Sequence, residues 1–225
     1  MPQKLLKALP QSEQKRLKKL IELESAARSK GYKCIVGVDE AGRGPLAGPV
    51  VAAACSIQEG VFFSGINDSK LLIPKVRKAI FEQLCSNTGV QYGVGVIDHI
   101  EIDRINILQA SLEAMRIAVR QLTFLPDCLL VDGIHSFTDE IYSEPIVKGD
   151  SRSQMIAAAS ILAKETRDQI MVHYHEQYPE YGFADHKGYA TRKHCEALVK
   201  YGPCPIHRRS FSRIANSSYE LTLFD

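Results

Sequence analysis

The sequence predicts an α/β protein with a mixed central sheet flanked by helices and a mostly helical C-terminal subdomain. Three observations support this. Short apolar, β-branched runs alternate with longer amphipathic stretches over most of the chain. The first two runs, 33–39 and 49–57, follow each other so closely that part of the sheet should be antiparallel. The region after residue 176 offers only helical and loop patterns.

The chain opens with an amphipathic stretch over residues 12–29, which we expect to form one helix. Leu17 and Leu20 belong to its apolar stripe. Ser12 is a candidate N-cap, and Gly31 is a plausible stop because glycine readily adopts the left-handed conformation that ends helices.

Strands and helices then alternate along the chain. The expected strands span about 33–39, 49–57, 91–97, 127–132 and 146–148. The expected helices span about 74–86, 104–122, 151–174 and 191–200. Asp150 and Ser151 both suit the start of the helix at 151. Residues 98–103 and 178–189 should be connections, and the tail after the last helix should be irregular.

The composition is that of an ordinary globular protein, with 45% hydrophobic and 24% charged residues among 225. We divide the chain into an N-terminal helical extension at 1–31, an α/β domain at 32–176, and a helical C-terminal subdomain with its tail at 177–225. The net charge of +2 says little about partners. Basic residues cluster near both ends, His207, Arg208 and Arg209 among them, and suit either a phosphate backbone or a solvated face.

The six cysteines include no C-x-x-C pair, so a structural zinc site is not expected. No apolar segment is long enough to span a bilayer, and the chain does not open with a signal peptide pattern. We therefore expect reduced thiols, a cytoplasmic location and no membrane contact.

Four acids stand out because each lies at a strand end or in the turn that follows: Asp39, Glu40, Asp132 and Asp150. Ligands of open α/β sheets collect beyond the carboxyl ends of the strands. Since strand alternation would send Asp39 and Glu40 to opposite faces, a shared site requires the strand to fray there. Taken singly, Asp150 also suits a helix cap and Asp132 a turn.

Converging carboxylates repel one another unless a cation neutralises them. Carboxylate oxygens without nearby thiolate or imidazole groups select Mg²⁺ or Mn²⁺. Two such ions can activate a water molecule and stabilise the leaving oxygen of a phosphodiester. The four acids therefore predict a metal-dependent hydrolytic site.

A glycine turn, Gly42-Arg43-Gly44, follows the first two acids. Together with Gly48 it has the spacing G-x-G-x-x-x-G and leads into an apolar run. A dinucleotide-binding site requires G-x-G-x-x-G and a following helix, so we reject that interpretation. Such a turn lets backbone groups approach a ligand closely, for example a nucleic-acid sugar.

The stretch Gly37–Val50, GVDEAGRGPLAGPV, resembles the opening signature of ribonuclease HII, the bacterial type 2 ribonuclease H. Further matching segments follow in order: Asn67–Lys70, Ile105–Ala110, Val131–Gly133, Lys148–Ser151, Ala158–Lys164 and His186–Tyr189. The resemblance covers about residues 33–212 and leaves out the N-terminal helix and the last dozen residues.

This resemblance implies a ribonuclease H-like fold and an endoribonuclease that cuts the RNA strand of RNA–DNA hybrids. It also implies incision at ribonucleotides embedded in duplex DNA, two Mg²⁺ or Mn²⁺ ions during catalysis, and products with 5′-phosphate and 3′-hydroxyl ends. The family carboxylates fall on Asp39, Glu40, Asp132 and Asp150.

The resemblance also assigns substrate contacts. The backbone of Gly42, Arg43 and Gly44 is implied to sense the ribose 2′-hydroxyl, and Tyr189 to stack on the following sugar. Without the resemblance, Tyr189 would be read as a loop aromatic that covers apolar surface. Further candidates are phosphate contacts at Ser69, Lys70, Ser160 and Lys164, for which solvated or capping roles remain open, and a groove-lining role for His186.

Two other functions remain to be distinguished. A non-catalytic nucleic-acid-binding protein would not need the four acids, and a DNA nuclease on the same fold would not need a 2′-hydroxyl reader. We expect a monomer. The apolar segment Leu221–Phe224 is either a free end or a docking peptide for a sliding clamp.

Overall fold

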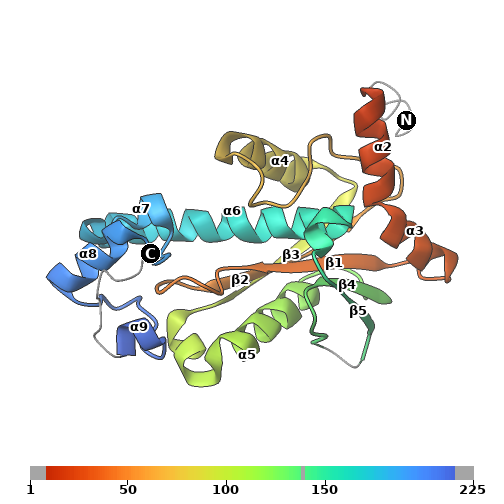
Figure 1. The fold of residues 1–225 in the computed structure, drawn as a ribbon. Coiled ribbons are helices and arrows are strands. Elements are labelled where there is room, and N and C mark those ends of the chain that lie inside the picture. Colours follow the sequence, from red (N-terminus) through yellow and green to blue (C-terminus); the bar gives the residue numbers. More distant parts are fainter. Residues whose placement is uncertain (1–8, 138–139, 216–225) are drawn as a thin grey trace.

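The computed structural model describes residues 9–137 and 140–215, which form one five-stranded sheet with helices on both faces (Figure 1). The strands are β1 Ile35–Ala41, β2 Val50–Ile57, β3 Val90–Ile97, β4 Cys128–Asp132 and β5 Tyr142–Ile146. The α-helices are α2 Gln11–Leu20, α3 Glu22–Ser29, α4 Pro74–Ser86, α5 His99–Arg120, α6 Gln154–Gln177, α7 Phe183–His186, α8 Arg192–Tyr201 and α9 Ser212–Ala215. Two 3₁₀ turns are η1 Gly149–Ser151 and η2 Pro179–Tyr181.

The sheet is mixed, as predicted, with the strand order β3-β2-β1-β4-β5. β1, β2 and β3 form antiparallel pairs, whereas β4 runs parallel to β1 and β5 parallel to β4. Because β1 and β4 are parallel neighbours, their carboxyl ends meet at the same edge of the sheet. Two of the predicted acids, Asp39 and Asp132, lie at these ends.

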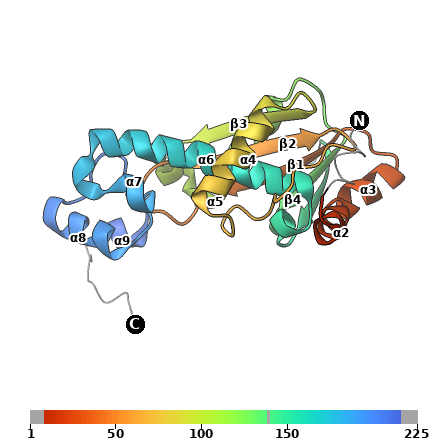
Figure 2. The same cartoon turned by 90° about the horizontal axis from the view of Figure 1, so that it is seen from above.

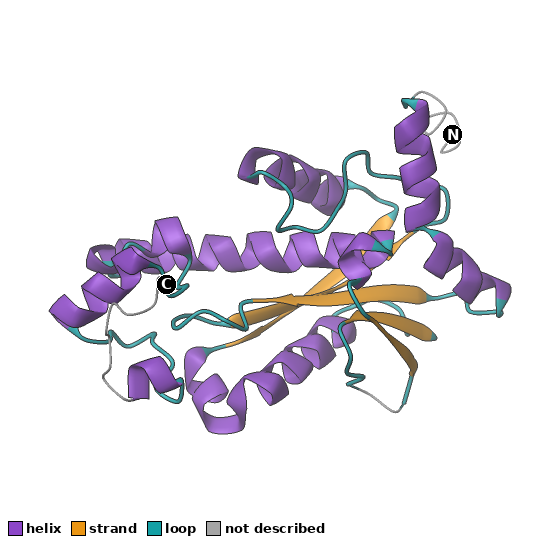
Figure 3. Cartoon of the chain, in the orientation of Figure 1, coloured by secondary structure: helices purple, strands orange, loops and turns teal. Residues whose placement is uncertain are grey.

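The two faces of the sheet bury different residues of the same strands. Ile35 and Leu130 pack in the core under α6, whereas Val36 and Val131 pack in the core under α5. Figure 3 shows the strands as a single layer between these helices. Gly37 permits the close approach of α6, because a β-carbon there would lie 2.3 Å from the amide nitrogen of Ile156.

Helix α6 extends beyond the sheet and carries the C-terminal helices on its far end, while α2 and α3 lie at the opposite end of the molecule (Figure 2). Residues of this C-terminal region form a separate core that includes Tyr181, Phe183 and Leu198. Met171 of α6 belongs to the same core. The division of the chain at 31 and 176 stays a prediction, since α6 passes from one region into the other without a break.

The N-terminal prediction was wrong in two respects. Residues 12–29 form two helices, α2 and α3, because the backbone at Ile21 (φ −103°, ψ 9°) is not helical. Pro10 stands at the N-cap of α2, and Ser12 lies inside the helix. Gly31 has φ +101° and follows the end of α3, as expected.

Three other boundaries differ from the sequence prediction. The expected connection 98–103 is the first turn of α5, capped by the Asp98 side chain, which accepts from the Glu101 amide at 2.8 Å. Helix α6 begins only at Gln154, with Ser153 as its cap. Asp150 and Ser151 instead belong to η1, which Lys148 introduces with a left-handed φ of +54°.

The remaining differences concern short elements. The predicted strand 146–148 is β5, four residues earlier at its start, and the expected loop 178–189 contains η2 and α7. The tail contains the short helix α9. Within the described part of the chain, no helix is both long and apolar enough to cross a membrane. The segment Leu221–Phe224 lies outside the described residues.

Candidate active site

Three carboxylates from different elements converge at the carboxyl ends of the parallel strands. Asp39 comes from β1, Asp132 from β4 and Asp150 from η1. One carboxylate oxygen of each lies within 4.8 Å of the others, a spacing that one cation could bridge. Asp39 and Asp132 are 93 residues apart in sequence and come together because β1 pairs with β4. Asp150 follows Asp132 by 18 residues and is brought back by the short turn after β5.

The surrounding protein holds these carboxylates in place. Asp39 accepts hydrogen bonds from the Ser160 hydroxyl and, at 2.7 Å, from the Glu40 amide. Asp132 Oδ1 accepts from the Gly149 amide at 2.6 Å, which ties the end of β4 to η1. Asp39 and Asp150 are only 3% and 6% exposed. Their oxygens are thus oriented before any ligand binds.

The cluster is short of positive charge. Burial, and then the charges of Glu40 and Asp132, raise the pKa of Asp39 well above its usual range. Burial, together with Asp68 and Asp132, raises the pKa of Asp150 to about 6. An oxygen-only site whose acids repel one another fits a hard divalent cation, which would offset the repulsion.

Glu40 is not part of this triad. β1 continues regularly to Ala41, so the fraying that a shared site of Asp39 and Glu40 would require is not present. Glu40 has the parity of Val36 and Val38, which pack toward α5, while Asp39 faces α6. The Glu40 carboxylate lies 3.3 Å from Arg43 Nη1. Burial raises the pKa of Glu40, and the charge of Asp132 acts in the same direction.

Two residues of the 67–70 loop border the triad. After burial, the charge of Asp68 is the largest contribution to the raised pKa of Asp150, a role that the sequence did not reveal. The charges of Asp39, Asp68, Asp132 and Asp150 together raise the pKa of the exposed Lys70 ammonium group. Lys70 therefore interacts electrostatically with these four carboxylates, and it is exposed to solvent beside them.

The glycine turn and Tyr189 lie next to each other. Gly42 has φ +99°, a conformation that favours glycine, and a β-carbon there would collide with Arg167 Nε at 2.1 Å. A β-carbon on Gly44 would lie 3.7 Å from Cε1 of Tyr189. Tyr189 is 42% exposed, so its ring can meet a ligand beside the turn.

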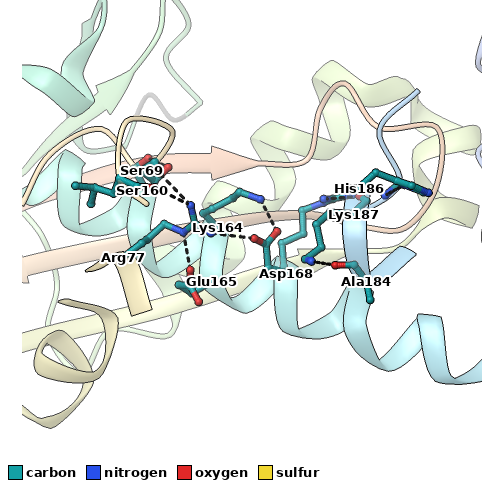
Figure 4. A network of polar contacts seen from close by, with 12 residues as sticks. Ser69, Arg77, Ser160, Lys164, Glu165, Asp168, Ala184, His186 and Lys187 are labelled. Carbon is teal, nitrogen blue, oxygen red and sulfur yellow. Dashed lines mark hydrogen bonds and ion pairs between the residues drawn. The ribbon is translucent and has the colours of Figure 1, made fainter. Parts of the chain in front are cut away.

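The other predicted contacts form a polar network along α6, which Figure 4 shows from close by. The hydroxyls of Ser69 and Ser160 lie 2.9 Å apart in a buried pair. Either hydroxyl can donate in this pair, and Ser160 also contacts Asp39. Lys164 forms an ion pair with Asp168, so its charge is already partly neutralised.

Arg77 connects this network to α4. Its guanidinium contacts Glu165 Oε1 at 2.5 Å and Asp168 Oδ2 at 3.3 Å, and it donates to the Ser69 carbonyl at 3.2 Å. A groove of about 480 Å³ runs beside these groups. It is lined by Pro74, Lys75, Arg77, Lys78, Lys164, Glu165, Asp168, Asp185 and Lys187.

His186 lies inside the C-terminal region. Its Nε2 faces the Tyr181 carbonyl at 2.7 Å, and its Nδ1 accepts from the Gly188 amide at 3.2 Å. With both ring nitrogens bound to backbone and 8% exposure, His186 supports the loop that carries Tyr189. A direct contact with a ligand stays a prediction.

Sequence reasoning missed the buried arginines. Arg208 was grouped with surface cations, but it is fully buried, as is His207. Arg167 is 1% exposed in the middle of α6. A cation among apolar helix residues could have indicated Arg167, whereas nothing local distinguishes Arg208 from its neighbour Arg209.

Comparison with known proteins gives a consistent result. The sequence profile of the family described as Ribonuclease HII matches residues 36–214. A ribonuclease HII of Chlamydia trachomatis serovar L2 is 53% identical over 197 residues, covering 88% of this chain and 90% of the relative. The ribonuclease HII of Chlamydia pneumoniae is 50% identical over 203 residues, covering 90% and 94%.

Solved structures agree on the fold. Ribonuclease H2 from Pyrococcus horikoshii OT3 aligns with a TM-score of 0.67 and 28% identity, covering 82% of this chain and 96% of that one. The ribonuclease HII in a PCNA complex from Archaeoglobus fulgidus gives 0.65 at 22% identity, covering 78% and 94%. Bst-RNase HIII in complex with Mn²⁺ gives 0.57 at 19% identity, covering 85% and 71%.

The family match spans the strands, the converging acids, the glycine turn and Tyr189. The mixed sheet with flanking helices is the ribonuclease H-like fold that the sequence predicted. The chain therefore belongs to the ribonuclease HII family of metal-dependent endoribonucleases that act on RNA–DNA hybrids.

Proposed function

We propose that this endoribonuclease also incises duplex DNA at single embedded ribonucleotides and uses two divalent ions, Mg²⁺ or Mn²⁺, for hydrolysis. The observation that carries the proposal is the largely buried triad of Asp39, Asp132 and Asp150 beside Tyr189 and a glycine turn whose Arg43 and Gly44 are exposed. When bound, the ions would supply water activation and stabilisation of the leaving oxygen. Glu40 is the fourth proposed ligand, at the rim of the triad.

The residues around the ions would act mainly by holding the ligands. The hydrogen bond from Ser160 orients Asp39, and the Gly149 amide orients Asp132. Hydrolysis by an activated water leaves 5′-phosphate and 3′-hydroxyl ends, because the 2′-hydroxyl does not attack. A Mn²⁺ complex has been solved for the related fold of Bst-RNase HIII, which supports divalent metal use without deciding between the two ions.

Ribose discrimination is assigned to the turn and Tyr189. Only the 2′-hydroxyl distinguishes a ribonucleotide from a deoxyribonucleotide in a duplex, so its reader must be close and rigid. We assign this role to backbone groups of Gly42, Arg43 and Gly44. The ring of Tyr189 would pack on the adjacent sugar and leave no room for a second 2′-hydroxyl.

The phosphate contacts are not equivalent. Lys70 is exposed and close to the acids, so it is the strongest candidate to meet a phosphate. Ser69 and Ser160 are buried and bonded to each other, which favours support of Asp39 over direct contact. Lys164 would need to exchange part of its pairing with Asp168 for a phosphate oxygen.

The decisive experiment compares two duplexes of one sequence, one with a single ribonucleotide and one entirely of DNA, in Mg²⁺ and in Mn²⁺. We expect cleavage of the first only, with 5′-phosphate and 3′-hydroxyl ends. Cleavage of hybrid RNA without incision at the single ribonucleotide would refute the wider activity and leave the family activity intact.

A sliding-clamp contact is proposed for the segment Leu221–Phe224. The ribonuclease HII of Archaeoglobus fulgidus has been solved in complex with PCNA, which supports a contact of this kind. Gel filtration of this protein with a bacterial clamp, with and without the last five residues, tests the contact and also the expected monomeric state.

A further inference from the structure

Two arginine guanidinium groups are buried together beneath the glycine turn. Arg208 is 0% and Arg167 1% exposed. Arg208 donates to the carbonyls of Gly42 (2.6 Å), Arg43 (3.0 Å), Gly48 (2.9 Å) and Pro49 (3.0 Å). The four acceptors belong to the two ends of the turn that joins β1 to β2, so one side chain holds the two ends of this turn together.

Arg167 approaches the same region from α6. It donates to the carbonyls of Pro49 at 2.9 Å, Lys187 at 3.0 Å and Ala47 at 3.2 Å. Its guanidinium also lies 5.9 Å from the ring centre of Tyr189. Both arginines therefore share the Pro49 carbonyl, but only Arg208 binds the carbonyls of Gly42 and Arg43.

This arrangement is electrostatically unfavourable in isolation. Within the described part of the chain, neither guanidinium forms an ion pair with a carboxylate, and their compensation comes from carbonyl dipoles. Burial lowers the pKa of Arg208 to about 9, and the neighbouring Arg167 charge acts in the same direction. A neutral or apolar side chain would pack there at lower electrostatic cost, so packing alone does not explain why a guanidinium is buried here.

The peptide geometry explains how Arg208 orients the backbone amides of the turn. In a trans peptide the N–H points away from the C=O of the same unit. Because Arg208 holds the carbonyls of Gly42 and Arg43 inward, the amides of Arg43 and Gly44 point outward. Arg43 and Gly44 are exposed, and among the described residues these two amides have no acceptor. Two free donors therefore face the ligand side beside Tyr189.

The buried charge also strengthens these donors. A hydrogen bond from a cation to a carbonyl polarises the whole peptide unit, so its N–H becomes a better donor. The effect acts on the same two units that present the free amides.

We infer that Arg208 is the positioning residue of the ribose reader: its guanidinium orients and polarises the Gly42–Arg43 and Arg43–Gly44 peptides so that their amides discriminate a 2′-hydroxyl from a hydrogen. The inference rests on the proposed role of this turn. It makes the C-terminal region, which supplies Arg208, necessary for ribose recognition although the metal ligands lie elsewhere.

The test measures binding without cleavage, in Ca²⁺, to a duplex with one ribonucleotide and to the all-DNA duplex of the same sequence. The affinity ratio of the two reports ribose recognition separately from general DNA binding. Arg208→Lys keeps the charge but cannot span four carbonyls, so we expect the ratio to fall by about tenfold, the equivalent of one charged hydrogen bond. Affinity for the all-DNA duplex should stay within about twofold.

Arg167→Lys is the matched control, because it also removes a buried guanidinium from the Pro49 carbonyl but leaves Arg208 on the turn. We expect it to keep the ribose ratio of the wild type. An unchanged ratio in Arg208→Lys, or equal losses in both variants, would overturn the inference. A wild type that does not distinguish the two duplexes would instead refute the proposed reader itself.

A second measurement needs no variant. If the contacts of the Arg208 guanidinium are preformed, the side-chain nitrogen resonances of Arg208 in the wild type are resolved and exchange slowly with solvent before and after the ribonucleotide duplex binds. Averaged, rapidly exchanging resonances in the free protein would overturn the inference even if Arg208→Lys failed to fold.

Discussion

At the scale of single residues, the site combines groups that are unfavourable for the fold. Asp39, Asp132 and Asp150 lie close enough to repel one another, and burial further disfavours the charges of Asp39 and Asp150. The protein maintains them with hydrogen bonds from Ser160 and the Gly149 amide. Stability and catalysis should therefore respond in opposite directions to the loss of one acid.

Asp132→Asn should show this opposition. Cleavage of hybrid in Mg²⁺ is expected to fall by more than about a hundredfold, because a proposed metal ligand is lost. The metal-free protein should gain on the order of 1 kcal/mol of unfolding free energy, the equivalent of about one pKa unit of relieved repulsion. Thermal unfolding in EDTA measures the gain. A variant with wild-type cleavage would contradict the metal-site assignment.

Tyr189→Ala tests the junction contact. The loss is expected to be about 1–3 kcal/mol in transition-state stabilisation, the usual range for an aromatic contact to a nucleotide. It should be larger on a single embedded ribonucleotide than on a continuous hybrid, where no junction is read. Tyr189→Phe, which keeps the ring, is the control. Equal losses on both substrates would assign Tyr189 to general binding or packing.

At the scale of elements, helices outside the sheet support the site. Glu24 of α3 is 2% exposed, and its Oε1 accepts from Ser153 Oγ at 2.8 Å and the Met155 amide at 3.0 Å. It thus binds the N-terminus of α6, next to η1 with Asp150. The N-terminal extension is therefore attached to the helix that leads out of the site.

Glu24→Ala should lower the unfolding free energy by about 1–3 kcal/mol, because it leaves two buried donors without an acceptor. Glu24→Gln keeps an acceptor oxygen and removes a buried charge whose pKa is raised by burial. We expect this second variant to be as stable as the wild type at pH 7, or more stable. Urea unfolding compares them, and equal losses would show that the charge itself is required.

A chain of histidines stabilises the C-terminal region. His207 and His194 join through their Nε2 atoms at 2.9 Å, and His194 Nδ1 lies 2.9 Å from the Tyr189 carbonyl. Because a carbonyl only accepts, a neutral His194 carries its proton on Nδ1, and His207 then donates from Nε2. In that tautomer the contact of His207 Nδ1 with the Cys204 carbonyl at 3.2 Å is not a hydrogen bond. The Cys204 thiol, 3.1 Å from His207 Nδ1, can complete the chain as a donor. The chain requires neutral rings and ends on the backbone of Tyr189.

Acid should therefore weaken this region. Burial lowers the pKa of His194 to about 3 and of His207 to about 4, below the usual 6.5. The unfolded chain binds these protons first, so the stability contribution is complete above pH 6.5 and declines as the pH falls toward 4. At pH 5 the contribution of each ring to the unfolding free energy should be about 2 kcal/mol smaller than at neutral pH. Unfolding measured from pH 7.5 to 5 checks this, and a His194→Gln variant should show a shallower decline.

At the scale of the whole molecule, buried and exposed basic residues have different roles. Arg208 cannot track a phosphate backbone because it is buried, whereas its neighbour Arg209 is exposed. Lys75 and Lys78 are exposed at the groove beside α6. The surface cations near the site, and not the net charge of +2, should therefore determine nucleic-acid binding.

Binding of hybrid in Ca²⁺ should weaken steeply between about 50 and 300 mM salt through counterion release. Arg209→Ala should reduce the slope of log affinity against log salt by about one if it meets one phosphate. Arg120→Ala, a change at the C-terminal end of α5, should leave the slope unchanged. An affinity that stayed flat with salt would exclude a phosphate-tracking surface.

The sequence by itself determined the alternation of strands and helices, the antiparallel start of the sheet and the positions of the four acids at strand ends or in the turns that follow. Local patterns suffice for these features, because side-chain periodicity and turn residues are read from neighbours along the chain. They do not locate a break such as Ile21 or a left-handed residue such as Lys148, whose conformations depend on packing.

Only the tertiary structure decided which acids meet and what surrounds them. Strand pairing across 93 residues sets Asp132 beside Asp39, and the unbroken alternation of β1 leaves Glu40 on the other face. The roles of Asp68, Arg167 and Arg208 depend on partners far away in sequence. Burial and long-range charge are properties of the folded chain. Arg208 and Arg209 are adjacent and have the same local pattern, yet Arg208 is buried and Arg209 is exposed.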